Sequence, residues 1–306
     1  MSEITIPSRC EAEERIRCFL PPREQESHKG THGNALLCCG SPRYTGAAML
    51  SAMGALRAGA GITHLLSAEA ALLPVRIRLP EVVCHPVPGV TESPRVLATA
   101  DRIASPRGAI LIGCGIGLGN GSETAAFCEA LAALLAVAGA PVVLDADALN
   151  MLSADPRGAA PVLAAARRPV VLTPHPTEFS RLTGLPVSDI QANRTGKASA
   201  FAKAAGVTLL LKGHGTVIAT ADGHCTVNPS GTPALAKGGS GDVLAGVLVS
   251  LLACGMPAPE AAFAAAYLHG AAGERLATRD SLYGLLPSEL PGAIAGELCR
   301  LTSNAS

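Results

Sequence analysis

Short apolar runs that alternate with alanine-rich stretches constrain most strongly what this chain of 306 residues can fold into. The apolar runs have the length of strands, and the stretches between them, of about 10 to 15 residues, have the length of helices. The apolar runs are continuous, which is typical of strands that helices cover on both faces. The pattern predicts an α/β fold with a central, mostly parallel sheet flanked by helices. Strands are expected at 34–39, 62–66, 82–85, 109–112, 141–144, 170–172 and 207–211.

Helical stretches and two further strands complete the expected organisation. Helices are expected at 46–58, 122–137, 188–205, 242–254 and 259–277, with a short one around 11–19. The runs 216–220 and 225–228 are short and separated by a turn, which predicts an antiparallel pair. Because there is no internal repeat and no long linker, we expect one domain over residues 27–306, preceded by a charged extension over residues 1–26.

Composition excludes several classes of function. Lys plus Arg and Asp plus Glu both number 24, and Trp is absent, so nothing favours nucleic acid or an acidic membrane surface. The longest uncharged stretches, 130–144 and 243–259, contain Gly and Pro and are shorter than the roughly 18 apolar residues of a membrane span. The ten cysteines show no C-x-x-C spacing that would predict a zinc site. We therefore expect a soluble, cytoplasmic protein without nucleic-acid or membrane partners.

The strongest chemical signal is the glycine-rich segment 237–242, which leads directly into an expected helix. Its glycines let the backbone approach a ligand closely, and the N–H groups of a helix start favour a phosphate. Asp242 falls in the first turn of that helix, where the helix dipole favours an ionised carboxylate. Such a carboxylate could take a proton from an attacking hydroxyl. The alternative is that Asp242 is an ordinary helix cap.

A second segment, Lys212-Gly213-His214-Gly215-Thr216, lies between two expected strands. Its glycines could admit a nucleotide, and its lysine and threonine could contact phosphate or ribose. The alternative is a plain hairpin turn.

Three more segments follow expected strands, where ligands of open α/β sheets bind. The glycines of 113–119 miss the dinucleotide spacing of G-x-G-x-x-G but suit close contact between backbone and ligand. Asp145 and Asp147 could bind Mg²⁺, or Asp145 could cap the following helix. His175 stands between two prolines, which direct it toward the presumed site.

Taken together and in this order, these segments resemble the ADP-dependent NAD(P)H-hydrate dehydratase family, carbohydrate-kinase-like repair enzymes of ribokinase-like fold. The resemblance starts at 28–34, runs through 44–50, 55–61 and 113–117, and covers roughly residues 21 to 300. A Gly-Gly-x-Gly-Asp loop alone indicates only the wider kinase superfamily. The combination with Asp-Ala-Asp-Ala-Leu-Asn at 145–150 and Thr-Pro-His-Pro-Thr-Glu at 173–178 is much narrower.

The resemblance implies roles for particular residues. The hydrated dinucleotide would contact Ala47, Gly115, His175 and Asp242, with Asp242 as the catalytic group. The nucleotide ADP, with Mg²⁺ on its phosphates, would be held by Lys212, Gly213, His214, Gly215, Thr216 and Gly241. The chain departs from the family at Cys114, where proline is usual, and at Lys237 and Ser240, where threonine is usual. Lys237 would add a charge beside the anion site. A homo-oligomer, with the tetramer as its expected form, is also implied, and the epimerase domain to which the family is often fused is not expected here.

The implied reaction is the dehydration of the S-epimer of hydrated NADH or NADPH at the expense of ADP, giving AMP and phosphate. Phosphorylation of the ring hydroxyl would convert a poor leaving group into a good one. Two alternatives remain at this point. A kinase for a small hydroxyl compound would share the glycine-rich loop and leave a stable phosphorylated product, and a nucleotide-sensing protein would bind without catalysis.

Overall fold

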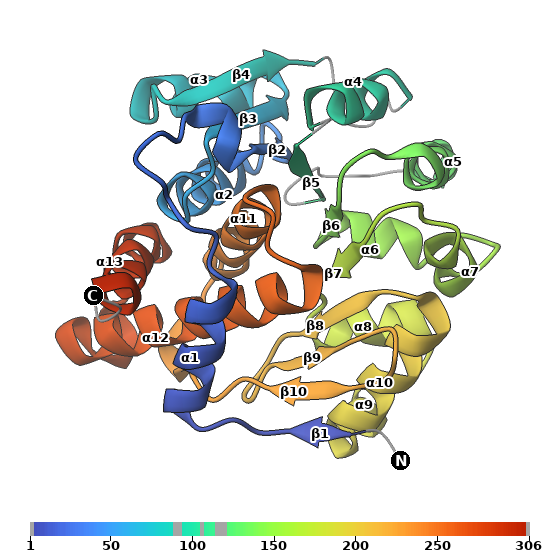
Figure 1. Cartoon of the computed structure of the whole chain (residues 1–306). Helices are drawn as coiled ribbons and strands as arrows, with labels where there is room; N and C mark the ends of the chain where they lie inside the picture. Colours follow the sequence, from blue (N-terminus) through green and yellow to red (C-terminus); the bar gives the residue numbers. More distant parts are fainter. Residues whose placement is uncertain (1–2, 88–93, 105–106, 114–120, 304–306) are drawn as a thin grey trace.

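The computed structural model describes residues 3–87, 94–104, 107–113 and 121–303. Within them lies a sheet of ten strands in the order β1-β10-β9-β8-β7-β6-β5-β2-β3-β4 (Figure 1). Neighbouring strands from β4 through β8 are parallel, while β9 is antiparallel to both β8 and β10. Both the parallel sheet and the antiparallel pair are as predicted. The strands are β1 (Ile4–Thr5), β2 (Asn34–Cys38), β3 (Ile62–Ser67), β4 (Val82–Pro86), β5 (Gly108–Ile112), β6 (Val142–Leu144), β7 (Val170–Leu172), β8 (Thr208–Leu211), β9 (Val217–Ala219) and β10 (Cys225–Val227).

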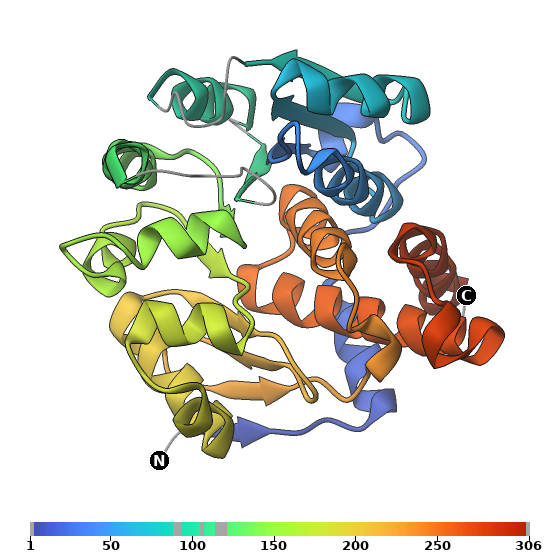
Figure 2. The same cartoon turned by 180° about the vertical axis from the view of Figure 1, so that it is seen from behind.

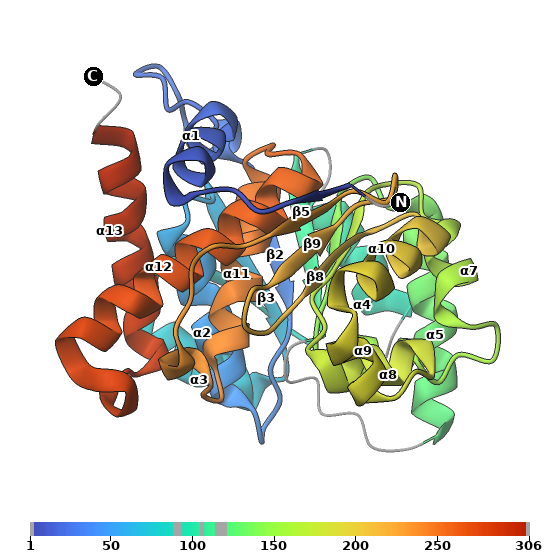
Figure 3. The ribbon, with the colours of Figure 1, turned by 90° about the horizontal axis from the view of Figure 1, so that it is seen from below.

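Helices cover the two faces of the sheet in separate layers. One layer holds α1, α2, α3, α11, α12 and α13, and the other holds α4 to α10 (Figures 1 and 3). The helices are α1 (Arg9–Phe19), α2 (Thr45–Arg57), α3 (Glu69–Arg78), α4 (Pro94–Ala104), α5 (Gly121–Val137), α6 (Asp147–Leu152), α7 (Ala159–Ala164), α8 (Pro176–Thr183), α9 (Val187–Ala192), α10 (Arg194–Ala205), α11 (Ser240–Ala253), α12 (Ala258–Gly284) and α13 (Leu290–Ser303), with short 3₁₀ turns η1 (Lys29–His32), η2 (Pro233–Leu235) and η3 (Pro287–Glu289).

Strands β2, β3 and β5 to β9 contribute to two hydrophobic cores because successive side chains point to opposite faces. In β2, Ala35 and Leu37 pack with α2, α11 and α12, whereas Leu36 and Cys38 pack with the α5 layer. All four side chains are fully buried. The continuous apolar runs of the sequence are thus explained by helices on both sides of the sheet.

Two glycines bring α2 and α11 into backbone contact. A Cβ on Gly246 would lie 2.0 Å from the carbonyl oxygen of Ser51, and one on Gly54 would lie 2.6 Å from that of Val243. No larger side chain fits at such an approach. The same pair of helices lies side by side when the molecule is seen from behind (Figure 2). This contact fixes the start of α11, and with it the glycine-rich loop, relative to α2.

The prediction of a single helix at 188–205 is wrong in one respect, because the structure has two helices there, α9 and α10. Asn193 between them has φ −150° and ψ 66°, outside the helical region. Its side-chain oxygen accepts a hydrogen bond from Gly196 N at 3.0 Å, which is the geometry of an N-cap. Asparagine competes for backbone hydrogen bonds in this way and so begins a new helix.

The N-terminal residues pack on the rest of the fold. Strand β1 pairs with β10, and the predicted short helix is observed as α1. Arg15 forms an ion pair with Glu260 of α12 at 2.7 Å, and Glu13 one with Arg300 of α13 at 2.6 Å. The division between an extension over 1–26 and a domain over 27–306 stays a prediction. Among the described helices, none is both long and apolar enough to cross a bilayer.

Candidate active site

Residues that follow β2, β6, β7 and β8 come together at the carboxyl edge of the sheet, beside the first turn of α11. Three features define this site: an ion-paired cluster after β6, β7 and β8, the histidine that caps α8, and the glycine-rich start of α11. This is the edge at which open α/β sheets bind their ligands.

Lys212, directly after β8, is the centre of the cluster. Its Nζ lies 2.9 Å from Oδ1 of Asp145 and 3.9 Å from Oε2 of Glu178. Both carboxylates are nearly inaccessible to solvent, and Thr173 also donates to Asp145 at 2.8 Å. Burial raises the pKa of Glu178, although Lys212 opposes the shift. One ammonium group therefore faces two buried carboxylates.

Asp145 does not cap the helix that follows it, so this alternative from the sequence is wrong. The N-cap of α6 is Ala146, which has no side chain to accept a hydrogen bond. Ala146 has φ 50° and ψ −113°, a backbone conformation that costs a non-glycine residue of order 1–3 kcal/mol. Such strain persists only where the surroundings impose it, here between two strand ends. The carboxylate of Asp145 points instead to Lys212.

His175 caps α8 through its imidazole ring. Its Nδ1 accepts hydrogen bonds from the N–H groups of Thr177 at 3.2 Å and Glu178 at 3.3 Å, while Glu178 Oε2 accepts from His175 N at 2.8 Å. Since Nδ1 accepts, the ring is neutral with its hydrogen on Nε2. Burial lowers the pKa of His175, and the charges of Lys212 and Arg181 lower it further. The side chain is 46% exposed, so its outer edge can meet a ligand.

The glycine-rich loop ends in the first turn of α11. Gly239, at φ 98°, is the N-cap, and Asp242 is the third helical residue, so the alternative of Asp242 as an ordinary helix cap is wrong. A Cβ on Gly241 would lie 3.6 Å from Nζ of Lys212, which places the lysine against this turn. Burial raises the pKa of the Cys39 thiol, and the charge of Asp242 raises it further, so Asp242 lies near the end of β2.

Residues 212–216 connect the antiparallel strands β8 and β9. The alternative of a hairpin is therefore correct for the topology of this segment. The topology does not decide whether the hairpin binds a nucleotide. Gly213 has φ 147° and Gly215 has φ 60°, while His214 is exposed. Thr216 Oγ1 closes the turn by donating to Gly213 O at 3.0 Å.

Arg194, at the start of α10, supports this hairpin and was not singled out from the sequence. Its Nη2 donates to the carbonyl oxygens of Leu211 at 3.0 Å and Lys212 at 3.3 Å. Its Nε is buried without a hydrogen-bond partner, and burial lowers the pKa of the guanidinium. Arg194 and the two residues that it contacts are 17 and 18 positions apart in the chain. No local sequence pattern therefore predicts these contacts.

Ala47 lies in the first turn of α2 and is 9% exposed. The adjacent Ala48 packs over the end of β2, since a Cβ on Gly40 would lie 2.6 Å from Ala48 Cβ. Ala47 thus belongs to the same edge of the sheet as Asp242. Gly115 lies outside the described residues.

Lys237 does not add its charge to the anion site, contrary to the expectation from the sequence. Its Nζ donates to the carbonyl oxygens of Tyr283 and, at 2.6 Å, Leu285. The lysine therefore ties the glycine-rich loop to the end of α12.

Within the described residues no group of three or more His, Cys, Asp or Glu side chains is arranged to hold a metal ion. Two carboxylates, those of Asp145 and Glu178, lie beside Lys212. Mg²⁺ commonly binds through one or two carboxylates together with waters and substrate phosphates. The donor set fits an ion that arrives with a nucleotide.

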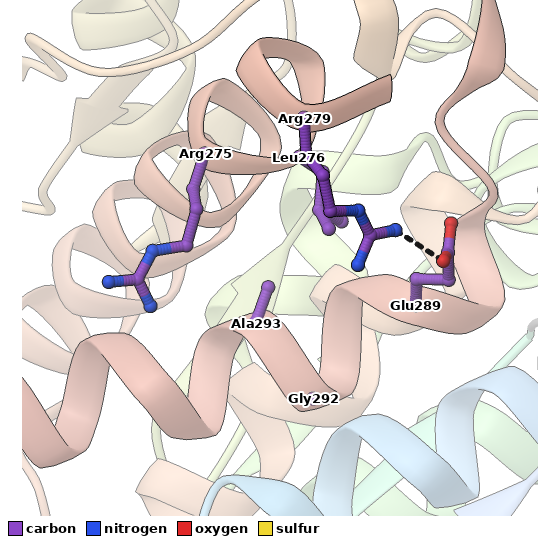
Figure 4. Close-up of a pocket in the computed structure, with 6 residues that line it drawn as sticks. All are labelled: Arg275, Leu276, Arg279, Glu289, Gly292 and Ala293. Carbon is purple, nitrogen blue, oxygen red and sulfur yellow. Dashed lines mark hydrogen bonds and ion pairs between the residues drawn. The ribbon is translucent and has the colours of Figure 1, made fainter.

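A separate surface pocket lies between α12 and α13 (Figure 4). Arg279 there pairs with Glu289 and Asp280, and Arg275 pairs with Glu297 at 3.4 Å. Each arginine in the pocket already pairs with a carboxylate. None of the predicted site residues that the structure describes lines the pocket.

The sheet order, the two helical layers and the site at the carboxyl edge define the chain as a ribokinase-like α/β protein. It is similar to a ribokinase-like superfamily protein of Enterococcus faecalis, with 28% identity, a TM-score of 0.79, and coverage of 97% of this chain and 96% of that one.

Within this fold class, the sequence identifies one particular family. The model of the NAD(P)H-hydrate dehydratase family matches residues 35–295, and the chain belongs to this family. It is 38% identical over 278 residues to the ADP-dependent (S)-NAD(P)H-hydrate dehydratase of Bacillus subtilis, covering 91% of this chain and 93% of the relative. The crystal structure of the ADP/ATP-dependent enzyme from that organism, grown with ATP and Mg²⁺, has a TM-score of 0.78 and 36% identity, with coverage of 94% and 97%.

Longer relatives also match. The chain is 37% identical to the bifunctional NAD(P)H-hydrate repair enzyme of Moorella thermoacetica, covering 90% of this chain and 51% of that protein. The chain thus spans about half the length of this relative.

Proposed function

We propose that this chain dehydrates the S-epimer of hydrated NADH and NADPH to NAD(P)H, at the expense of ADP. The observation that carries the proposal is the contact of Lys212, in the β8–β9 hairpin, with the first turn of α11 that bears Asp242. That contact brings a cation, a glycine-rich backbone and a carboxylate to one edge of the sheet, in a member of a family with this activity.

The nucleotide would lie along the hairpin and the start of α11. Lys212 through Thr216 and Gly241 would hold the AMP portion of ADP. The positive φ of Gly213 and Gly215 supports this assignment, because it gives the hairpin a tight turn that other residues rarely adopt. The guanidinium of Arg194 packs against Gly213 and holds this turn in place. Lys212 would meet the phosphate charge, with the first-turn N–H groups of α11 beside it.

The hydrated dinucleotide would lie on the other side of Asp242. Ala47, Gly115 and His175 would contact it, and Asp242 would face its ring hydroxyl. The neutral ring of His175 would donate through Nε2 to an oxygen of the substrate in place of Glu178 Oε1, which lies 3.3 Å from Nε2, since its Nδ1 is occupied by the cap of α8.

The reaction would proceed in two steps. Asp242 accepts the proton of the ring hydroxyl as its oxygen attacks the β-phosphorus of ADP, and the bond from that phosphorus to the bridging oxygen breaks to release AMP. The lone pair of the ring nitrogen then helps to expel phosphate. The carbon–oxygen bond to phosphate breaks, and the neighbouring ring carbon loses a proton. The sum is NAD(P)H, AMP, inorganic phosphate and a proton.

Mg²⁺, when bound, would neutralise charge on the donor phosphates. Asp145 and Glu178 would hold it from the protein side, directly or through water. Lys212 lies 2.9 Å from Asp145 and 3.9 Å from Glu178 and would be the counter-ion of this cluster until the nucleotide arrives.

The proposal is tested by incubating the purified protein with hydrated NADH, ADP and Mg²⁺ while following the absorbance of the dihydropyridine ring. We expect ADP-dependent regeneration of NADH. If no NADH forms but a sugar or vitamin alcohol is phosphorylated to a stable product, the chain is a kinase. If nucleotide binds and neither reaction occurs, it is a binding protein.

We further propose that the protein acts in the cytoplasm and that it is a homotetramer. Light scattering coupled to size exclusion gives the mass in solution. A monomeric mass would contradict the second proposal.

A further inference from the structure

Ser240, the first residue of α11, is hydrogen-bonded to His269 of α12. The imidazole Nε2 lies 3.0 Å from the carbonyl oxygen of Ser240 and 3.1 Å from its hydroxyl oxygen. A carbonyl oxygen only accepts hydrogen bonds, so Nε2 carries the hydrogen. One imidazole N–H therefore anchors both polar groups of the residue that opens the helix.

This contact is inside the protein. Ser240 is 4% exposed and His269 is 8% exposed. Burial lowers the pKa of His269 to about 4, so the ring is neutral near pH 7. A buried imidazole that made no hydrogen bond would be destabilising, and this one is committed to Ser240.

The segment of α12 that carries His269 is itself fixed. Asn228 Nδ2 donates to the carbonyl oxygen of Ala266 at 3.2 Å, and Ser230 Oγ donates to that of Tyr267 at 2.9 Å. A Cβ on Gly270 would lie 2.2 Å from Ser230 Oγ, so the helix and the 228–231 loop are in direct contact. His269 thus projects from a backbone that has little freedom to shift.

The glycine-rich loop, in contrast, lacks intrinsic rigidity. Gly238, Gly239 and Gly241 surround Ser240, and glycine has more backbone freedom than any other residue. The orientation of the first turn must therefore come from contacts outside the loop. The contact with His269 falls on Ser240, one residue before Gly241 and two before Asp242.

We propose that His269 is a positioning residue for phosphoryl transfer, which fixes the first turn of α11 through Ser240. The inference rests on the proposed function. His269 contacts neither ADP nor the hydrated dinucleotide, and it acts by aiming Gly241 and Asp242. A displacement of about 1 Å at a reacting group can lower a rate about a hundredfold, so an unanchored turn would impair turnover.

The test compares His269→Leu, which removes the donor, with His269→Gln, whose amide N–H can replace it. We expect His269→Leu to lower kcat at least about tenfold and to raise the Kd for ADP by a smaller factor, because the proposed nucleotide contacts of Lys212 and the hairpin stay in place. His269→Gln should recover most of kcat. The control is Leu276→Ala, a buried packing change two turns farther along α12, which should lower Tm and leave kcat unchanged.

Two results would overturn the proposal. One is a kcat for His269→Leu within about threefold of wild type. The other is an equal loss of kcat in His269→Leu and His269→Gln that follows the loss of Tm, as for a purely structural residue. The shift of the Gly241 amide signal on adding ADP is a readout that needs no hydrate. If the wild type regenerates no NADH, the proposed function fails, and the change of this shift in His269→Leu but not in His269→Gln still tests the anchor.

Discussion

Nζ of Lys212 lies 2.9 Å from Oδ1 of Asp145, which joins the ends of β8 and β6 across the end of β7. The aspartate side chain is 3% exposed and the lysine side chain 20%. A carboxylate that is almost inaccessible to water needs a nearby cation to offset the cost of burying its charge. The same ammonium group also faces the first turn of α11. The Lys212 side chain therefore belongs both to the ion-paired cluster and to the proposed nucleotide site.

Replacing Lys212 by Met should therefore affect both stability and binding. It leaves Asp145 and Glu178 buried without their cation, and breaking such a pair costs about 3 kcal/mol of unfolding free energy. Urea unfolding measures this loss, and calorimetry should show weaker ADP binding. The double variant Lys212→Met/Asp145→Asn should regain part of the stability but not the affinity. Strictly additive losses of stability would contradict a direct interaction.

The cap formed by His175 predicts a difference between two variants. His175→Asn keeps a good N-cap for α8, whereas His175→Ala removes it and should cost about 1 kcal/mol. The pKa of His175 is lowered in the fold, so its stabilising effect is present above the ordinary value of about 6.5 and is lost as the pH falls through the lowered value. Wild type should lose more Tm than His175→Asn between neutral and mildly acid pH. Parallel Tm curves would show that the ring titrates as in the unfolded chain.

Arg194 predicts a change in nucleotide affinity without a change in chemistry. Arg194→Met removes the donors to the carbonyl oxygens of Leu211 and Lys212, so the hairpin should become more mobile. We expect KM for ADP to rise several-fold with kcat nearly unchanged, which is the pattern of lost binding. Steady-state kinetics with varied ADP measures both values. A lower kcat at unchanged KM would place Arg194 in the chemical step.

Asp242→Asn tests the proposed base. Asparagine keeps the size of the side chain and removes its ability to accept a proton, and general-base catalysis is typically worth 10²- to 10⁴-fold in rate. We expect an unchanged circular dichroism spectrum, similar ADP binding, and a loss of at least about two orders of magnitude in turnover. Turnover within about threefold of wild type would require another base. His175 could serve only if its Nδ1 gave up the cap of α8.

The sequence predicted the sheet well because its strands are marked by continuous apolar runs. β2 was expected at 34–39 and is observed at Asn34–Cys38, and β7 was predicted to the residue. The break between α9 and α10 was missed because Asn193 is compatible with a helix until its side chain is seen to cap one. The short helices α6 and α7 have 6 residues each, which is too few for helical periodicity to be recognised.

The site was predictable where its residues stand in compact motifs, and not where the contacts are distant in the chain. The glycine-rich loop and the 212–216 hairpin are continuous segments. The partners of Lys212 and Ser240, by contrast, lie 67 and 29 residues away, so the roles of Asp145 and His269 emerge only from the fold. Nor does the sequence disclose that Lys237 bonds to carbonyl oxygens of α12 and not to an anion.

The most direct test of the central claim follows the oxygen atom of the ring hydroxyl. Hydrated NADH carrying a heavy-oxygen label at that position is incubated with the protein, unlabelled ADP and Mg²⁺, and the inorganic phosphate is examined by mass spectrometry. If the hydroxyl is phosphorylated before elimination, each NADH formed is accompanied by one AMP and one phosphate that contains the label. Label found in water, with unlabelled phosphate, would contradict the account, because the hydroxyl would then have left without being phosphorylated.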